Sequence, residues 1–414
     1  MINVENHIEE HVEEHVEEHF EEQQEDRMNQ TKPLAHLTVL DFSAVYAGPI
    51  CSRLLADCGA NVIKIEATGA GDLTRGPKGT SRVFSHFNAG KQSIALDLKH
   101  AEGQRVAHLL LESADVVIEN FRPGVMKQFG LDYASVAKSR PDLVYCSISG
   151  FGQQGPMAQR AAYAPIAHAA SGFDIAHARI QRDPNADPSV WGIMIADMLT
   201  GTYAFGAIQT ALLGRTQSGK GDYIDVTMLE SMMSLIPGQI QLAQIPNAPP
   251  ARGFHPVRTQ DGFVMICIVS GKNLRTLCKA MGREDMLEDP RFAFGEHFKN
   301  QPLFLQEIEN WSSQLSTDAC ELALNATGVP CSRYNSPEDL FEHPQVKVRQ
   351  SFTQQQDEYG AFLIQNAPFT FAGVNTSTSS ETPALGQHTD EILGSVLGYS
   401  AADVARLREA GAVG

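Results

Sequence analysis

The spacing of hydrophobic positions divides this chain into two parts. Between residues 37 and 228, short aliphatic and β-branched runs alternate with longer stretches of helical periodicity. We predict six strands, at residues 37–43, 60–66, 93–98, 114–121, 142–150 and 222–228. Apolar strands separated by helices are typical of a parallel sheet that is covered on both faces. The pattern predicts a doubly wound, Rossmann-like α/β domain that binds its ligands at the carboxyl ends of the strands.

The remainder of the chain predicts a smaller domain and a return to the first one. Its 414 residues exceed the limit of roughly 250–300 residues for a single core. An apolar helical run that ends in prolines, at residues 229–252, is typical of a linker. We expect a large domain at residues 34–228, a small α+β domain at residues 253–345, and a C-terminal segment at residues 346–414 that returns to the large domain.

The first 33 residues have a different composition from the rest. Residues 1–32 carry eleven acids and two bases, so their net charge is 2 − 11 = −9 out of −17 for the chain. Four histidines repeat there at every fourth position (His7, His11, His15 and His19). Such spacing can place imidazoles on one helical face for a transition metal. We favour the other interpretation, an acidic and disordered tail whose like charges repel one another.

Composition excludes several classes of protein. The chain is 43% hydrophobic and 20% charged, without an apolar run near the ~18 residues of a membrane span. Its negative charge argues against a nucleic-acid partner. The seven cysteines include no Cys-x-x-Cys pair, and no secretory signal pattern begins the chain. We therefore expect a globular cytoplasmic protein with reduced thiols, no metal site and no membrane partner.

Two glycine motifs suggest nucleotide binding but have the wrong context. Residues 150–155 match G-x-G-x-x-G, yet they follow the fifth predicted strand, precede Pro156 and lack a later acidic residue for a ribose. Residues 214–220 begin like a P-loop, but Gly221 stands where Ser or Thr must bind magnesium. A helix-to-strand turn explains the second motif better.

A more specific signal follows the first predicted strand. Ala47, Gly48 and Pro49 open a helix there, and small residues let a ligand approach the free N–H groups of its first turn. A polyanion such as a diphosphate would suit that helix end. A plain helix start explains these three residues equally well.

Seven blocks of the chain occur in the order found in class III CoA-transferases. They lie at residues 40–66, 69–76, 87–99, 114–133, 141–156, 196–230 and 385–393. The chain thus resembles a family that includes formyl-CoA transferase, carnitine CoA-transferase and α-methylacyl-CoA racemase. The resemblance implies an interlocked homodimer that transfers CoA from an acyl-CoA to a carboxylic acid, with no tightly bound cofactor.

The resemblance also identifies a nucleophile. In the family it is an aspartate ahead of the helix that leads to a glycine-lysine-glycine turn, and Asp197 occupies that position. Its apolar neighbours favour a desolvated, reactive carboxylate, and a helix N-cap is a second role that it can combine with the first. Asp197 is thereby expected to form an acyl anhydride and then an aspartyl-CoA thioester.

The family's CoA contacts fall on residues that mostly follow predicted strands. They are Tyr46, Ala47, Leu96, Asp97, Leu98, Lys99, Asn120, Phe121, Arg122, Arg160 and Tyr163. Two positions depart from the formyl-CoA transferase branch, which has a basic residue at Ala67 and a glutamine at Tyr46. The first departure implies that the CoA nucleotide is held differently, and the second argues against formate or oxalate as the substrate.

Two other functions compete with CoA transfer. Racemases of this family carry His-Asp directly after the glycine block, where this chain has Tyr163 and Ala164. His168 lies five residues further on, and we expect it to be structural. A non-catalytic CoA-binding protein would keep the same fold, but the intact Asp197 favours an enzyme.

Overall fold

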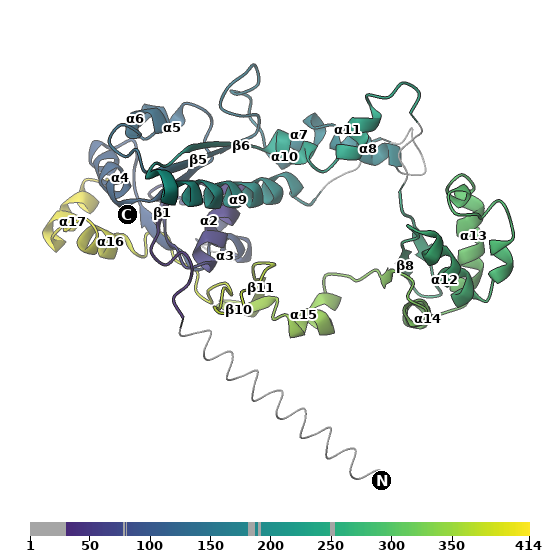
Figure 1. Ribbon diagram of the computed structural model, residues 1–414. Helices are drawn as coiled ribbons and strands as arrows, with labels where there is room; N and C mark the ends of the chain where they lie inside the picture. Colours follow the sequence, from purple (N-terminus) through teal and green to yellow (C-terminus); the bar gives the residue numbers. More distant parts are fainter. Residues whose placement is uncertain (1–29, 78, 80, 181–186, 189–191, 249–252) are drawn as a thin grey trace, which may run out of the picture. The chain divides into compact units, whose positions relative to one another are not determined.

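The structure is a computed structural model that describes residues 30–77, 79, 81–180, 187–188, 192–248 and 253–414. The histidine repeat and most of the predicted tail therefore lie outside the described residues. The chain forms two compact units (Figure 1). Unit 1 comprises the described parts of Met1–Ile175 and Ser189–Pro237 together with Gln350–Gly414, and unit 2 comprises those of Ala176–Pro188 and Gly238–Arg349.

Unit 1 is built on a six-stranded parallel sheet. Its strands are β1 (Thr38–Asp41), β2 (Asn61–Glu66), β3 (Gln92–Ala95), β4 (Val116–Glu119), β5 (Val144–Ser149) and β6 (Tyr223–Thr227). They lie in the order β3-β2-β1-β4-β5-β6, and every pair is parallel. The predicted α/β fold with a parallel sheet is confirmed. Strand order reverses between β1 and β4, so the crevice that such sheets use for ligands opens at the ends of these two strands.

Helices cover both faces of this sheet because its strands are apolar on both sides. Val39 packs into one core with α2 (Ala47–Asp57) and α9 (Ile195–Ser218), and the adjacent Leu40 packs into the other core with α4 (Ala101–Ser113). Figure 1 shows α9 running along the sheet. The other helices of unit 1 are α3 (Arg82–Asn88), α5 (Val125–Gln128), α6 (Tyr133–Val136), α7 (Ala164–Ala170), α10 (Met228–Met233), α16 (Thr389–Ser395) and α17 (Ala401–Glu409).

The turn from α9 to β6 explains the second glycine motif. Gly219 ends α9 in the left-handed conformation, with φ at 68°. A side chain at Gly221 would approach the Leu143 carbonyl oxygen to 2.0 Å, so only glycine lets the chain pass β5 there. These glycines serve a helix-to-strand turn, as predicted.

The C-terminal residues add two features to unit 1. β10 (Phe352–Asp357) and β11 (Gly360–Gln365) form an antiparallel hairpin. Leu393 of α16 and Leu407 of α17 join the same core as Leu40. The last part of the chain therefore completes the large core.

Unit 2 has a three-stranded antiparallel sheet and its own core. The strands are β7 (Pro256–Arg258), β8 (Phe263–Ile266) and β9 (Cys331–Arg333). Its main helices are α12 (Gly271–Met281), α13 (Gln301–Ser312), α14 (Thr317–Ala326) and α15 (Pro344–Val348). The chain passes between the units within α8 (Phe173–Ile180), between Pro188 and Ser189, at the start of α11 (Pro237–Leu242), and after α15. Among the described helices, none is both long and apolar enough to cross a membrane.

Candidate active site

Asp197 lies in the first turn of α9, at the edge of the α2–α9 core. Its side chain is buried, with 7% of the residue exposed. Ala196 beside it belongs to that core, and Met194 and Ile195 pack against it. An acidic residue in the first turn of a helix is favoured by the unsatisfied N–H groups and the helix dipole. The sequence therefore places a carboxylate where a helix end favours its charge and apolar packing removes water.

A second helix end meets Asp197 at the same point. The backbone N–H of Ala47, the first residue of α2, donates a hydrogen bond to the Asp197 carboxylate. The two helices approach closely because Gly201 has no side chain: a Cβ there would lie 2.2 Å from Ile50 Cγ2 and 2.4 Å from the Ala47 carbonyl oxygen. Gly201 thus allows the amino ends of α2 and α9 to converge on one carboxylate.

The protonation of Asp197 reflects this environment. Burial raises its pKa to about 6, and the Ala47 N–H group opposes this rise. Within the described residues, no charged side chain contributes to this shift. The carboxylate is ionised at neutral pH but more basic than an exposed aspartate, and a buried, basic carboxylate is a good nucleophile.

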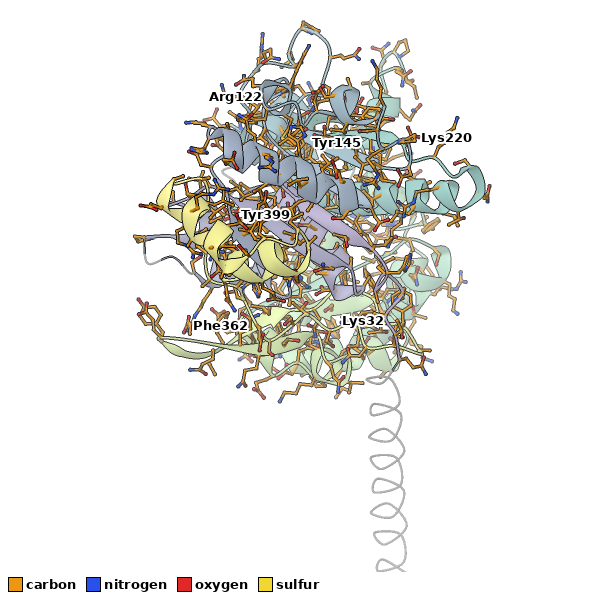
Figure 2. All side chains as sticks on the ribbon, turned by 90° about the vertical axis from the view of Figure 1, so that its left-hand side faces the viewer. Lys32, Arg122, Tyr145, Lys220, Phe362 and Tyr399 are labelled. Atoms are coloured by element: carbon orange, nitrogen blue, oxygen red, sulfur yellow. The ribbon has the colours of Figure 1, made fainter. Side chains whose placement is uncertain are left out.

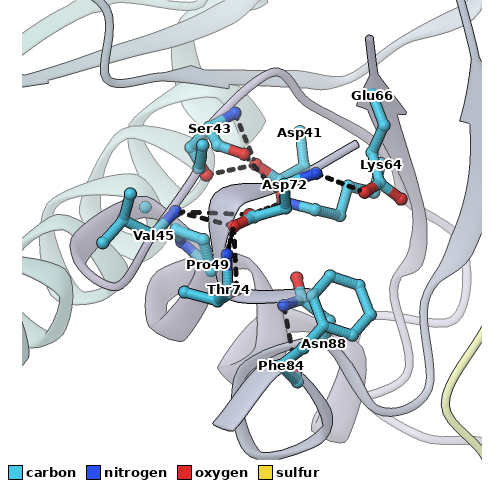
Figure 3. Close-up of polar contacts among 12 residues, drawn as sticks. Asp41, Ser43, Val45, Pro49, Lys64, Glu66, Asp72, Thr74, Phe84 and Asn88 are labelled. Atoms are coloured by element: carbon cyan, nitrogen blue, oxygen red, sulfur yellow. Dashed lines mark hydrogen bonds and ion pairs between the residues drawn. The ribbon is translucent and has the colours of Figure 1, made fainter. Parts of the chain in front are cut away.

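The loop between β1 and α2 rests on buried charged side chains (Figure 3). Lys91 contacts Asp41 at 2.9 Å, Lys64 contacts Asp72 at 3.0 Å, and all four side chains are at most 1% exposed. Arg75 and Glu66 form a third buried pair at 2.6 Å. Burial disfavours the charge of Asp41, but Lys91 and Lys64 outweigh it and lower the pKa of Asp41 well below its usual value. These three buried ion pairs support the β1–α2 loop.

His168 holds the start of α9. Its Nε2 accepts a hydrogen bond from the backbone N–H of Ala196 at 3.1 Å, and the residue is fully buried. Burial lowers the pKa of His168, while Asp174 opposes this. An Nε2 atom that accepts a hydrogen bond carries no proton. The geometry gives His168 a structural role beside the residue that precedes Asp197.

The predicted CoA contacts near α2 and β4 lie around the same loop. Tyr46 is the N-cap residue of α2, and its ring is 4.7 Å from that of Phe87. The side chain of Asn120 bonds to the backbone of Ala44. Ala47 is buried, Phe121 is half-buried, and Arg122 is exposed. The structure therefore gathers the two segments 46–47 and 120–122 at one end of the sheet.

The predicted contacts after β3 and β5 are more varied. Leu96 is only 1% exposed and packs in the core, and its backbone pairs with Val413. Asp97 accepts the backbone N–H of Lys99 at 2.8 Å. Leu98 packs partly buried against the core, whereas Lys99, Arg160 and Tyr163 are exposed. The side chain of Leu96 does not reach the surface.

Comparison with known proteins identifies the family. Residues 34–389 match the model of CoA-transferase family III. The chain belongs to this family. It is 33% identical over 394 residues to a succinate–glutarate CoA-transferase of Agrobacterium fabrum, which covers 89% of this chain and 96% of the relative. It is 30% identical over 421 residues to a formyl-CoA:oxalate CoA-transferase of Afipia carboxidovorans, over 92% of this chain and 98% of that one.

A solved structure supports the same assignment. A CaiB/BaiF family protein from Brucella suis matches with a TM-score of 0.77 and 30% identity, over 89% of this chain and 100% of that chain. The predicted family and the predicted activity are thus confirmed: this family III member is an enzyme that transfers CoA.

Sequence reasoning missed a cavity in this CoA-transferase. It has a volume of about 260 Å³ and is lined by residues that include Glu119, Arg122, Tyr133, Tyr145 and Tyr223. Of these residues, Figure 2 labels Arg122 and Tyr145. The rings of Tyr133 and Tyr223 stack at 5.0 Å. Burial raises the pKa of Glu119 to about 7, against the effect of a hydrogen bond from Ser147. Glu119 of β4, Tyr145 of β5 and Tyr223 of β6 come from neighbouring strands, and only the pairing of these strands reveals that they lie close together.

Sequence reasoning also missed the Lys64–Asp72 and Lys91–Asp41 ion pairs. Lys64 and Asp41 lie within apolar strands, and Asp72 lies in a glycine-rich loop. A charged residue inside an apolar strand is the one signal that indicates a buried partner.

Proposed function

We propose that this enzyme moves CoA from an acyl-CoA thioester to a carboxylic acid by covalent catalysis on Asp197. The observation that carries the proposal is the position of Asp197: a buried carboxylate at two helix ends whose pKa is raised by burial and is not lowered by any charged side chain among the described residues. Such a carboxylate has little hydration to lose when it attacks a thioester. Its position matches that of the family's nucleophile.

The reaction consists of four acyl exchanges. Asp197 attacks the thioester carbonyl carbon and the C–S bond breaks. This step releases CoA thiolate and forms a mixed anhydride between Asp197 and the donor acid. The thiolate attacks the Asp197 carbonyl carbon and expels the donor acid, which leaves an aspartyl-CoA thioester. The acceptor carboxylate then forms a second anhydride and releases the thiolate. The thiolate attacks the acceptor's acyl carbon, so that the new acyl-CoA departs and the Asp197 carboxylate returns. The Ala47 N–H group would stabilise negative charge on the aspartyl oxygen.

CoA would bind at the carboxyl ends of the strands. We propose contacts from the segments 46–47, 96–99 and 120–122 and from Arg160 and Tyr163. The exposed cations Lys99, Arg122 and Arg160 suit the phosphates of CoA. CoA and acyl-CoA act here as substrates, without a tightly bound cofactor.

We further propose a dicarboxylate of the succinate or glutarate kind as the acid. The support is the identity of 33% to a succinate–glutarate CoA-transferase, together with Tyr46 at the position where the formyl-CoA branch has glutamine. A panel of acids with succinyl-CoA as donor, analysed by mass, tests this. Faster transfer to formate or oxalate than to glutarate would contradict it.

An interlocked homodimer in the cytoplasm is the proposed form of the enzyme. Met233, Leu235 and Ile245 are exposed apolar residues of the segment predicted as a linker, and a partner copy would cover them. The seven cysteines are free, which suits a reducing compartment. Light scattering should give about twice 45.1 kDa. A stable monomer at micromolar concentration would contradict the dimer.

Trapping the covalent intermediate tests the central proposal. Incubation with acyl-CoA and hydroxylamine should leave a hydroxamate on Asp197, found by peptide mass mapping. Asp197→Asn should bind CoA but transfer it at least about 10³-fold more slowly, because an amide oxygen is a poor nucleophile. Asp403→Asn is the matched control, since Asp403 also lies in the first turn of a helix, α17, but is only half-buried. Near wild-type transfer by Asp197→Asn, or a label on another residue, would refute the mechanism.

A further inference from the structure

The side chain of Asn120 is tied to the loop between β1 and α2. Its Oδ1 accepts the backbone N–H of Ala44 at 2.9 Å, and its Nδ2 donates to the Ala44 carbonyl oxygen at 2.7 Å. One amide therefore pairs with both backbone groups of a residue 76 positions earlier in the chain. This two-point contact fixes the peptide planes on either side of Ala44.

The next residue has an unfavourable backbone conformation. Val45 has φ at +72°, in the left-handed region that β-branched residues avoid. Its N–H donates to both carboxylate oxygens of Asp72, at 3.3 and 3.2 Å. Lys64 in turn contacts Asp72 and donates to the Ser43 carbonyl oxygen at 2.8 Å. A conformation of this kind persists only where surrounding contacts impose it, and such positions cluster at functional sites.

The constrained turn leads directly to the group that contacts Asp197. Val45 precedes Ala47 by two residues, and the Ala47 N–H is the hydrogen-bond donor to the Asp197 carboxylate. The loop also folds tightly onto α2, because a Cβ at Gly48 would lie 2.1 Å from Ser43 Cβ. The turn at Val45 sets the direction in which α2 begins. The orientation of the Ala47 N–H group towards Asp197 follows from that direction.

We propose that Asn120 and Asp72 are positioning residues for CoA transfer: they clamp Ala44 and Val45, impose the left-handed turn, and thereby hold the Ala47 N–H on the Asp197 carboxylate. This inference rests on the proposed role of Asp197. It gives the side chain of Asn120 a task different from the direct CoA contact that the family resemblance implies. The two tasks differ in which step of the reaction suffers when the amide is removed.

The test compares turnover with CoA binding in Asn120→Ala and Asn120→Asp. Asn120→Asp keeps an acceptor for the Ala44 N–H but places an oxygen against the Ala44 carbonyl. Both variants should lower kcat by about 10- to 100-fold, the cost of a small misplacement at a reacting group, while the Kd for CoA in calorimetry stays close to wild type. The rate at which hydroxylamine traps Asp197 should fall in parallel.

Asn366→Ala is the matched control. Its amide accepts the Thr378 N–H at 3.0 Å and donates to the Gln350 carbonyl oxygen at 2.7 Å. Its oxygen also accepts the Thr353 hydroxyl at 2.7 Å, and all three contacts lie outside the β1–α2 loop. This control should lose stability but keep its kcat. A similar kcat loss in Asn366→Ala would overturn the proposal, because any lost amide contact would then suffice.

A rescue experiment asks whether the clamp acts through the turn. Glycine adopts positive φ without strain, so Val45→Gly added to Asn120→Ala should restore part of the lost kcat. If the double variant had the same kcat as Asn120→Ala, the proposal would be overturned. A wild-type kcat in Asn120→Ala would also overturn it, and so would weaker CoA binding by Asn120→Ala without a loss of kcat. These outcomes are separate from a failure of the proposed function, which would appear as continued transfer by Asp197→Asn.

Discussion

Asp41 and Asp197 are two buried aspartates of unit 1 with opposite electrostatic surroundings. Asp41 at the end of β1 is fully buried, and Lys91 lies 2.9 Å from it. Despite its burial, the nearby lysines lower its pKa, which keeps the carboxylate charged. Asp197 is almost as buried, but a backbone N–H is its favourable contact, and its pKa rises to about 6. The charge of Asp41 is balanced by lysines, whereas no described cation balances the charge of Asp197.

The comparison teaches that burial by itself does not identify a catalytic carboxylate. A buried carboxylate with a cation is stabilised in its charged form and loses basicity, so it can serve only the structure. A buried carboxylate without a cation destabilises the fold in its charged form, and that cost is tolerable where the charge is used in catalysis. Paired charges support the β1–α2 loop, while Asp197 has no ion pair among the described residues, as we expect for a nucleophile.

Breaking the structural pair should have the largest effect on stability. Lys91→Met conserves much of the volume but leaves Asp41 without its closest cation. We expect the free energy of unfolding to fall by about 3–5 kcal/mol, the usual cost of removing one partner of a buried pair. Urea denaturation measures this loss. Arg82→Ala is the control, because its ion pair with Asp357 is largely exposed to solvent and its removal should cost much less. Equal losses of unfolding free energy in Lys91→Met and Arg82→Ala would contradict the distinction between the buried and the exposed ion pair.

Neutralising Asp197 should have the opposite effect on stability. Its pKa is raised on folding from 3.8 to about 6, so the unfolded chain binds fewer protons between these values and stability falls as the pH rises through them. Asp197→Asn removes this cost, so its free energy of unfolding at pH 7 should be higher by up to about 3 kcal/mol. The variant should therefore unfold at a higher urea concentration. The gain should shrink towards pH 4. A loss of stability at pH 7 would mean that an unrecognised contact stabilises the charged carboxylate.

The pH profile sharpens the comparison on the side of activity. Protonated Asp197 is not a nucleophile, so kcat/KM should fall below about pH 6 and approach a tenfold loss per pH unit. Initial rates between pH 4.5 and 8, with unfolding monitored at each pH, measure this limb. A limb near pH 7 would instead point to Glu119, whose pKa is raised to about 7 by burial.

Removal of the acidic tail should have the smallest effect. Residues 1–27 lack the periodicity of a packed element, and their like charges oppose packing. A chain that begins at Met28 should keep the melting temperature and the kcat/KM of the full chain. A large change in either quantity would assign the tail to the fold or the site.

Local pattern was sufficient to determine the sheet and to predict Asp197 as the reactive residue. The strands of unit 1 are continuous apolar runs, and hydrophobic burial depends mainly on such runs and their spacing. The block around Asp197 was specific enough to single out that carboxylate among the aspartates of the chain. Both conclusions rest on residues that are close together in the sequence.

The tertiary structure alone decided what surrounds that carboxylate. Ala47 reaches Asp197 because Gly201 lets α2 and α9 approach, and no local pattern reports how two distant helices cross. The left-handed conformation of Val45 contradicts the intrinsic preference of valine and depends on Asn120, 75 positions further along the chain (120 − 45). The pKa values of Asp41 and Asp197 differ because burial and the distance to a lysine act over a few ångströms in space, whatever the separation along the chain.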